Sequence, residues 1–260
     1  MDLGLQGKYA LVTGGSHGIG RSVALALAEE GCHVAICARD PRRVQETAAA
    51  VQGKGVQALG LQGDATIPAD IERVMDTVVK TWGTLHVLVN NVGGGGRWGH
   101  EVVEQTPEEV WVDVYHKNAL AAVRFTMRVI PLMRKQRWGR VVTVTSTYGR
   151  EGGGRPWFTM AKTAQTALMK SLAMNHELAR DGLVFTSVAP GSIMIPDTGW
   201  DEERKRDPTR FGRMVDDSFP LGRLGTPEEV ASVIVFACSE QASLLTGASI
   251  AVDGGWSRSF

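Results

Sequence analysis

A glycine-rich run close to the N-terminus has the residue types and the spacing that hold a phosphate group. It occupies residues 13–20, after an apolar segment and before a predicted helix. Glycines permit a tight turn and let the backbone approach a diphosphate, which then rests on the free N–H groups of the helix N-terminus. A strand before the run and a helix after it strengthen this signal. We therefore expect the diphosphate of a nicotinamide dinucleotide to bind at Gly14, Ser16, His17, Gly18, Ile19 and Gly20.

The end of the second apolar segment indicates which dinucleotide binds. A carboxylate at this point would accept hydrogen bonds from the ribose 2′-OH and repel a 2′-phosphate. The segment instead ends at Ala38-Arg39, and a guanidinium pairs bidentately with a phosphate. His17 adds a second polar group. We therefore expect NADP(H) rather than NAD(H), and the alternative, in which Arg39 is solvated and Asp40 reaches the ribose, stays open.

Short apolar runs alternate with longer amphipathic segments along the whole chain, which predicts the elements that position these residues. Strands are expected at 9–13, 33–38, 56–61, 85–90, 140–145 and 183–189. Helices are expected at about 18–30, 41–52, 67–82, 107–136, 157–180 and 227–240. Asp40, Thr106 and Thr226 each precede a proline and are predicted helix caps. Most strands are continuously apolar, as in parallel sheets covered on both faces. The alternation predicts a single doubly wound α/β (Rossmann) domain over residues 1–260, with about seven parallel strands.

An ordered set of matches resembles the short-chain dehydrogenase/reductase family over essentially the whole chain. The glycine run has the family's Thr-Gly-x-x-x-Gly-x-Gly spacing, and residues 90–93 are similar to its Asn-Asn-Ala-Gly strand end, with Val92 in place of Ala. The tail at 252–255, Val-Asp-Gly-Gly, is also typical. The remaining matches are Asp64 after the third strand, Asn118 in mid-helix, Ser146 after the fifth strand, Lys162 in the next helix, and Pro190-Gly191 at the end of the sixth strand.

This resemblance implies an oxidoreductase that interconverts a small carbonyl compound and a secondary alcohol by hydride transfer. Ser146 would orient the substrate oxygen, and Lys162 would hold the nicotinamide ribose and lower a phenol's pKa. Asn118 would hold a water that links the lysine to solvent. The family also implies a homotetramer or homodimer joined through helices 107–136 and 157–180. The implied cofactor contacts beyond the glycine run are Arg39, Asp64, Ala65, Asn91, Gly93, Lys162, Pro190, Gly191 and Ile193.

Position 158 departs from the family's pattern. The family has a Tyr four residues before the Lys, on the same helix face. Here Phe158 precedes Lys162 by four, and Ser146 precedes Phe158 by twelve, one fewer than is common. Phenylalanine keeps the ring and loses the dissociable proton, which costs roughly 10²–10⁴ in rate where nothing replaces it. The sequence therefore predicts a catalytic set of Ser146, Phe158, Lys162 and Asn118 whose acid/base member is disabled.

Four interpretations of Phe158 stay open. In the first, the natural gene encodes Tyr and this sequence carries a deliberate change that traps a bound state. In the second, another donor acts, either Tyr148 or a water held by Lys162. In the third, the pocket performs chemistry without net redox, such as a retro-aldol or elimination step of a lyase. In the fourth, the protein is a pseudoenzyme or sensor that binds NADP without turning it over.

Two further glycine-rich runs border the expected active site. Four consecutive glycines lead into Arg97, Trp98 and His100, and the glycines at 152–154 precede Arg155. Mobile backbone that carries Arg and Trp suggests a roomy site for an aromatic or acidic carbonyl compound, with Arg97 pairing a carboxylate or phosphate. A flexible surface loop with a packed Trp98 is the alternative.

The stretch at about 191–220 is the one irregular segment. Its core is charged with one apolar break. It is either a solvated surface helix or a lid over the site, because it follows the carboxyl end of a strand. As a lid it would bring Ile193, Met194 and Trp200 to the substrate.

The composition excludes several classes of protein. Lys plus Arg and Asp plus Glu are both 28, and a zero net charge argues against nucleic acid or an anionic membrane as a partner. The three cysteines have no metal-ligand spacing, so we expect no metal site and reduced thiols. No signal peptide and no run of about 18 apolar residues is present. These features predict a cytoplasmic protein whose partner is a small molecule.

Overall fold

Seven strands form one parallel sheet in the computed structural model, which describes residues 1–260. Their order is β3-β2-β1-β4-β5-β6-β7, so the chain reverses direction across the sheet between β1 and β4. Ligands of doubly wound folds bind at such a switch point, beyond the carboxyl ends of the strands. The strands are β1 Tyr9–Thr13, β2 His33–Ala38, β3 Ala58–Gln62, β4 Val87–Asn90, β5 Gly139–Val144, β6 Leu183–Pro190 and β7 Ser249–Val252.

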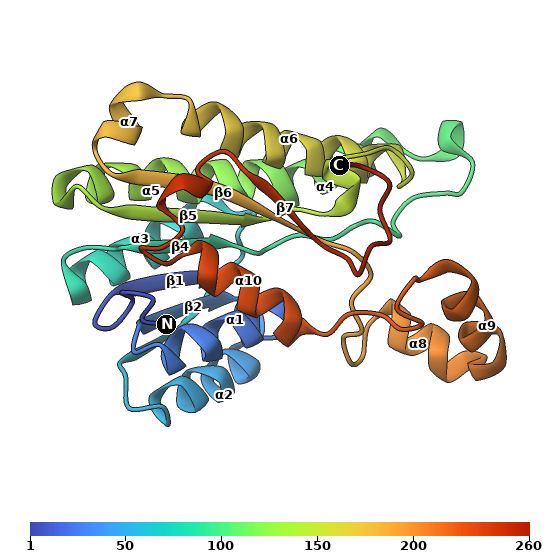
Figure 1. The fold of residues 1–260 in the computed structure, drawn as a ribbon, viewed down its shortest axis with the longest axis horizontal. Helices are drawn as coiled ribbons and strands as arrows, with labels where there is room; N and C mark the ends of the chain where they lie inside the picture. Colours follow the sequence, from blue (N-terminus) through green and yellow to red (C-terminus); the bar gives the residue numbers. More distant parts are fainter.

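Helices cover both faces of the sheet, which confirms the predicted fold class (Figure 1). One face carries α1 (Gly18–Glu29), α2 (Pro41–Gln52) and α10 (Pro227–Ala237). The other carries α3 (Pro68–Trp82), α4 (Glu108–Tyr115), α5 (Ala121–Gln136), α6 (Pro156–Ala173) and the short α7 (His176–Arg180). Each face has its own apolar core, because alternate side chains of the buried strands point to opposite sides. None of the helices has the length and apolarity needed to cross a bilayer.

Three details of the helices differ from the sequence prediction. The single helix expected at 107–136 is broken by a π-helical turn at His116–Leu120, which contains Asn118. The helix expected at 157–180 ends at Ala173. A separate helix, α7, begins at His176, and the Asn175 side chain caps its N-terminus. The predicted cap at Thr106 is wrong: α4 begins after Pro107, and the Thr106 hydroxyl accepts a hydrogen bond from the His100 N–H at 2.9 Å instead. The caps at Asp40 and Thr226 are confirmed.

The charged stretch after β6 folds into two helices, α8 (Gly199–Arg206) and α9 (Pro208–Ser218), which lie apart from the layers at one end of the sheet (Figure 1). Asp207-Pro208 separates them, because proline starts a new helix and Asp207 caps it. Phe211 and Val215 of α9 form a small apolar core with Phe219 and Leu224, which follow the helix. This segment is therefore not a solvated helix alone.

Candidate functional site

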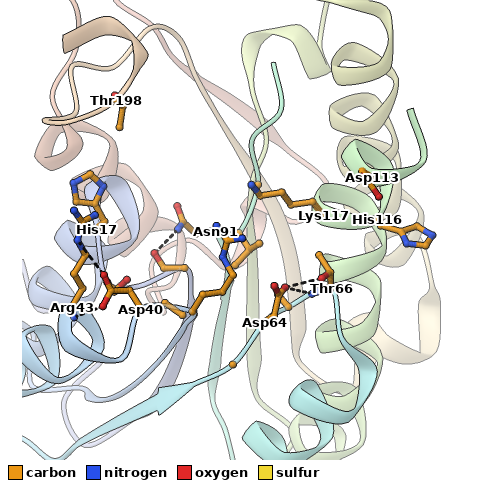
Figure 2. Close-up of a pocket in the computed structure, with 18 of the residues that line it drawn as sticks. His17, Asp40, Arg43, Asp64, Thr66, Asn91, Asp113, His116, Lys117 and Thr198 are labelled. Atoms are coloured by element: carbon orange, nitrogen blue, oxygen red, sulfur yellow. Dashed lines mark hydrogen bonds and ion pairs between the residues drawn. The ribbon is translucent and has the colours of Figure 1, made fainter. Parts of the chain in front are cut away.

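A cavity of about 790 Å³ lies at the carboxyl ends of β1 to β4 (Figure 2). This position is the switch point of the sheet. Eight of the predicted cofactor residues line the cavity, namely Gly14, Ser16, His17, Arg39, Asp64, Ala65, Asn91 and Gly93. Its volume falls within the range of small-molecule and cofactor sites.

The glycine turn fits closely between β1 and the end of β4. Gly14 and Gly18 have φ of 65° and 52°, conformations that favour glycine. A Cβ on Gly20 would lie 2.3 Å from the Gly14 carbonyl oxygen and 2.4 Å from Nδ2 of Asn91. That same Nδ2 donates to the carbonyl oxygens of Thr13 and Gly14 at 3.0 and 3.2 Å. Gly18, Ile19 and Gly20 therefore shape the turn and do not line the cavity.

The N-terminus of α1 is left without a side-chain cap. His17 occupies the capping position in an extended conformation, and its side chain makes no capping hydrogen bond. The first N–H groups of the helix therefore keep their capacity to donate to an anion. Burial lowers the pKa of His17, and Arg43 lowers it further, so this imidazole is neutral near pH 7. The turn thus offers backbone donors rather than a charged side chain.

The end of β2 presents one arginine without a protein partner. Asp40 is turned away to its helix, where Oδ1 accepts from the N–H groups of Arg42 and Arg43 at 3.0 and 3.2 Å. Its Oδ2 lies 3.6 Å from Nε of Arg43 (Figure 2). Arg39 makes a hydrogen bond only through its carbonyl oxygen, which accepts from Gln62. The guanidinium of Arg39 is therefore available to a ligand in the cavity.

Lys117 is a cavity residue that the sequence analysis missed. Its side chain extends from the π-helical turn toward the middle of the cavity, whereas His116 points the opposite way (Figure 2). The ammonium lies 4.6 Å from the ring centre of Trp98, which lines this cavity and not the substrate pocket where it was expected. Burial lowers the pKa of Lys117, Arg39 lowers it further and Asp64 opposes this. The one sequence signal for Lys117 as a site residue is that it directly precedes Asn118, which is itself a predicted site residue.

Lys162 and Asn118 are buried and meet at Gly93, which alone of the three lines this cavity. A Cβ on Gly93 would lie 2.6 Å from Oδ1 of Asn118 and 2.9 Å from Nζ of Lys162. Asn118 holds the loop after β4, because its Nδ2 donates to the Gly94 carbonyl at 2.8 Å and its Oδ1 accepts from the Gly94 N–H at 3.1 Å. Nζ of Lys162 donates to the carbonyl oxygen of Val144 at 3.1 Å. Burial lowers the pKa of Lys162 to about 7.

A second pocket of about 370 Å³ contains Ser146, Phe158 and Gly191. The Ser146 hydroxyl accepts a hydrogen bond from the Tyr148 N–H at 3.2 Å, so its own hydrogen is free to be donated into the pocket. The ring centre of Phe158 lies 5.7 Å from Nζ of Lys162. Tyr148 lines the same pocket, but burial raises its pKa and Glu151 raises it further. Lys162 therefore lies next to a residue of each cavity, Gly93 on one side and Phe158 on the other.

Comparison with known proteins identifies the family to which the chain belongs. A family model described as enoyl-(acyl carrier protein) reductase matches residues 14–257. Dehydrogenase/reductase SDR family member 4 of Sus scrofa is 34% identical over 256 residues, which cover 96% of this chain and 88% of that protein. The chain belongs to the short-chain dehydrogenase/reductase family. The 3-oxoacyl-(acyl-carrier-protein) reductase FabG of Escherichia coli is also 34% identical, over 97% of this chain and 98% of its own.

Solved structures of short-chain dehydrogenases/reductases have the same fold. The L-sorbose reductase of Gluconobacter frateurii, complexed with NADPH and L-sorbose, is 30% identical, covers 100% of both chains and superposes with a TM-score of 0.91. A 7α-hydroxysteroid dehydrogenase complexed with NADH is 26% identical over 99% of this chain and 97% of its own, with a TM-score of 0.88. The match over the full length agrees with the predicted resemblance.

Some predicted site residues lie outside both cavities of this short-chain dehydrogenase/reductase. Pro190 ends β6 and is buried. Ile193 is buried in an apolar core and pairs with Gly225 in a β-bridge, so its side chain stabilises the fold. His100 also lies outside, and its Nδ1 accepts from the Val102 N–H within its own loop. Arg97 does reach the smaller pocket, but it is already paired with Glu203 at 3.4 Å.

Proposed function

We propose that this short-chain dehydrogenase/reductase binds NADP(H) and interconverts a carbonyl compound and a secondary alcohol. The observation that supports this most is the place of Lys162, buried between the larger cavity at Gly93 and the smaller pocket at Phe158. A nicotinamide held near Gly93 would lie beside a substrate oxygen held by Ser146. When bound, the reduced nicotinamide supplies the hydride that the carbonyl carbon accepts.

The larger cavity fits a dinucleotide phosphate. A Cβ on Gly14 or Gly20 would occupy the space within the turn. The uncapped N-terminus of α1 supplies N–H donors for the diphosphate. Arg39 has a free guanidinium, while the Asp40 carboxylate is occupied by α2. This supports NADP(H) over NAD(H). The relatives differ in this respect, since the sorbose reductase holds NADPH and the steroid dehydrogenase holds NADH. For this chain the preference for NADP(H) over NAD(H) therefore rests on Arg39.

We propose further that the acid/base position is disabled. Ser146 can donate a hydrogen bond to the substrate oxygen, and Lys162, with its pKa near 7, can hold a proton close by. Phe158 has no proton to exchange. Tyr148 is the only phenol in the pocket, and no hydrogen bond joins it to Lys162. Phe158 therefore also supports a second function, an NADP-binding protein or sensor with little turnover.

The segment at 191–220 and the outer helices support two further parts of the proposal. Trp200, Met214 and Ser218 from α8 and α9 line the smaller pocket, as a substrate lid would.

On α4 and α6, Val112 and Met160 are 42% and 44% exposed beside a groove that contains Trp111, which favours a homodimer or homotetramer through these helices. Cys32, Cys37 and Cys238 are buried and unpaired, which supports a cytoplasmic location.

The test compares the chain with Phe158→Tyr and Tyr148→Phe in an assay of NADPH oxidation with a panel of carbonyl compounds. We expect Phe158→Tyr to gain about 10²–10⁴ in kcat, because it restores a phenol one helical turn from Lys162. NADPH binding, measured by calorimetry, should not change. Fast turnover of the unchanged chain that Tyr148→Phe abolishes would assign the donor to Tyr148. Binding of NADPH with no turnover by any variant would establish the sensor function.

A further inference from the structure

Four aromatic rings form a continuous wall in the smaller pocket. Phe219 lies parallel to Trp256, with ring centres 5.8 Å apart and planes at 20°. Trp256 meets Tyr148 edge-on at 5.6 Å, and Trp200 meets Phe219 edge-on at 6.4 Å. We call Trp200, Phe219, Trp256 and Tyr148 the aromatic wall, and all four line the pocket. They come from three distant parts of the chain, so this wall exists only in the folded protein.

The aromatic wall is fixed in place by the C-terminal segment. Arg150, two residues after Tyr148, donates to the carbonyl oxygens of Ser249 and Phe260 and to the Ser259 hydroxyl. The Arg258 N–H donates to the Glu151 carboxylate at 2.8 Å. Trp256 is thereby held over the pocket before any substrate arrives. A preformed wall loses little conformational freedom when a ligand binds.

The two arginines of the pocket are already neutralised or occupied by the protein. Arg97 donates to the Gly199 carbonyl at 3.1 Å, pairs with Glu203 and stacks on the Trp200 ring at 4.6 Å. Arg155 donates to the carbonyl oxygens of Gly99 and His100. Both guanidinium groups therefore already have hydrogen-bond partners in the protein, and the charge of Arg97 is also compensated by a carboxylate. The Ser146 hydroxyl, next to Phe158 in the lining, keeps a hydrogen to donate to a substrate oxygen.

From this pocket we infer the substrate class: a neutral aromatic ketone of one or two fused rings, or the corresponding alcohol. The inference rests on the proposed function and deepens it. The aromatic rings of the substrate stack on the wall, and its oxygen accepts from Ser146. A volume of about 370 Å³ is at the lower end of small-molecule sites, which matches a bicyclic skeleton. An acidic carbonyl compound is disfavoured, since Glu203 already compensates Arg97.

Binding to the NADP⁺-saturated protein tests this inference without requiring any proton transfer by residue 158. Calorimetry compares α-tetralone, a neutral aromatic ketone, with α-decalone, its saturated counterpart, and with levulinate, an aliphatic keto acid. Aromatic contacts should make α-tetralone bind about 2- to 10-fold more tightly than α-decalone. Levulinate should bind at least about 10-fold more weakly than α-tetralone. The inference is overturned when levulinate binds as tightly as α-tetralone, or when the two neutral ketones bind equally.

Variants locate the effect on the wall. Trp256→Leu should weaken α-tetralone binding about 10-fold and α-decalone binding less. Trp82→Leu makes the same change beside Tyr9, at the amino end of β1, and should leave both affinities unchanged. Trp200→Leu provides an independent measurement in case Trp256→Leu does not fold. Glu203→Gln should tighten levulinate several-fold, because it releases Arg97. Unchanged α-tetralone affinity in both tryptophan variants of the wall would refute the inference.

The two proposals fail in different ways. Absence of any heat on titration with NADP⁺ and NAD⁺ contradicts the proposed function. Normal NADP⁺ binding with the wrong order of ketone affinities contradicts only the substrate class. Melting temperatures of all variants, recorded with and without NADP⁺, show that a lost affinity does not reflect unfolding.

Discussion

The two cavities of this protein are built in opposite ways. The larger takes nearly all of its lining from residues 14–117, at consecutive strand ends of one half of the sheet. The smaller draws on segments from residue 96 to residue 256 and is walled by aromatic rings. The first presents backbone groups and charged side chains, whereas the second presents the aromatic rings together with hydroxyl groups, among them Ser146.

This difference shows which part of a ligand each cavity is suited to recognise. A diphosphate needs only a tight turn and a helix N-terminus, so a few adjacent residues suffice and they leave a motif in the sequence. A substrate skeleton is recognised by surfaces that the fold brings together, and these leave no local motif. The comparison can be tested by changes that damage one cavity and spare the other.

Gly20→Ala should damage the larger cavity most. Its Cβ would lie 2.3 Å from the Gly14 carbonyl oxygen and 2.4 Å from Asn91, so the turn must shift. Overpacking of this kind costs about 1–3 kcal/mol, and we expect dinucleotide binding to weaken about 100-fold for both NADP⁺ and NAD⁺. Calorimetry gives both affinities.

The matched control is Gly152→Ala. A Cβ on Gly152 meets nothing within 4 Å, and this loop borders the smaller pocket. We expect normal dinucleotide affinity. Equal affinities for Gly20→Ala and Gly152→Ala would mean that the glycine turn does not carry the diphosphate.

Arg39→Ala should have a smaller and more selective effect. We expect NADPH to bind about 10-fold more weakly and NADH to be unaffected, because an exposed hydrogen bond to a phosphate contributes at the lower end of charge-assisted bonds. Arg42→Ala removes the same charge from the exposed side of α2, where it pairs with Glu46 at 3.8 Å. A similar loss in both variants, or a loss for NADH as well, would remove Arg39 from the 2′-phosphate site.

Much of the fold could be predicted from the sequence, because its signals are local. Continuous apolar runs predicted the buried parallel strands, and Asp40 and Thr226 predicted two helix starts. The break at Asn118 could not be predicted, since a π-helical turn adds one residue without changing the apolar pattern of the flanking helices. The helix cap predicted at Thr106 is wrong for a related reason: the Thr106 hydroxyl binds His100 in the preceding loop instead of the helix N-terminus.

The candidate site could be predicted only in part. Gly14, Arg39 and Asn91 follow strands directly and line the cavity as expected, whereas Gly18, Ile19 and Gly20 only shape the turn. Trp98 lines the larger cavity and not the expected substrate pocket, because the chain direction after four glycines has no local signal. Trp256 has no sequence signal that places it at the site, since it reaches the smaller pocket only through the path of the C-terminal segment and its anchor at Arg150. Long-range packing, not residue type, decides these positions.

Lys162 joins the two cavities, and its burial should appear as a pH dependence of stability. Its pKa falls from 10.5 to about 7 through burial, so between these values the folded protein binds fewer protons than the unfolded chain. Stability from this group therefore rises with pH from about 7 to 10.5. Lys162→Met removes the burial penalty and should raise the melting temperature at pH 6 by about 2–4 °C for each kcal/mol recovered. The gain should shrink as pH approaches 10.

Lys170→Met, on the exposed side of the same helix, is the control and should show no such trend. Thermal unfolding of the cofactor-free proteins at several pH values gives the comparison directly. A Lys162→Met gain that is the same at pH 6 and pH 10 would mean that the ammonium is not penalised by burial. In that case Lys162 would stay protonated between the cavities at neutral pH, and it could not exchange its proton in the proposed reaction.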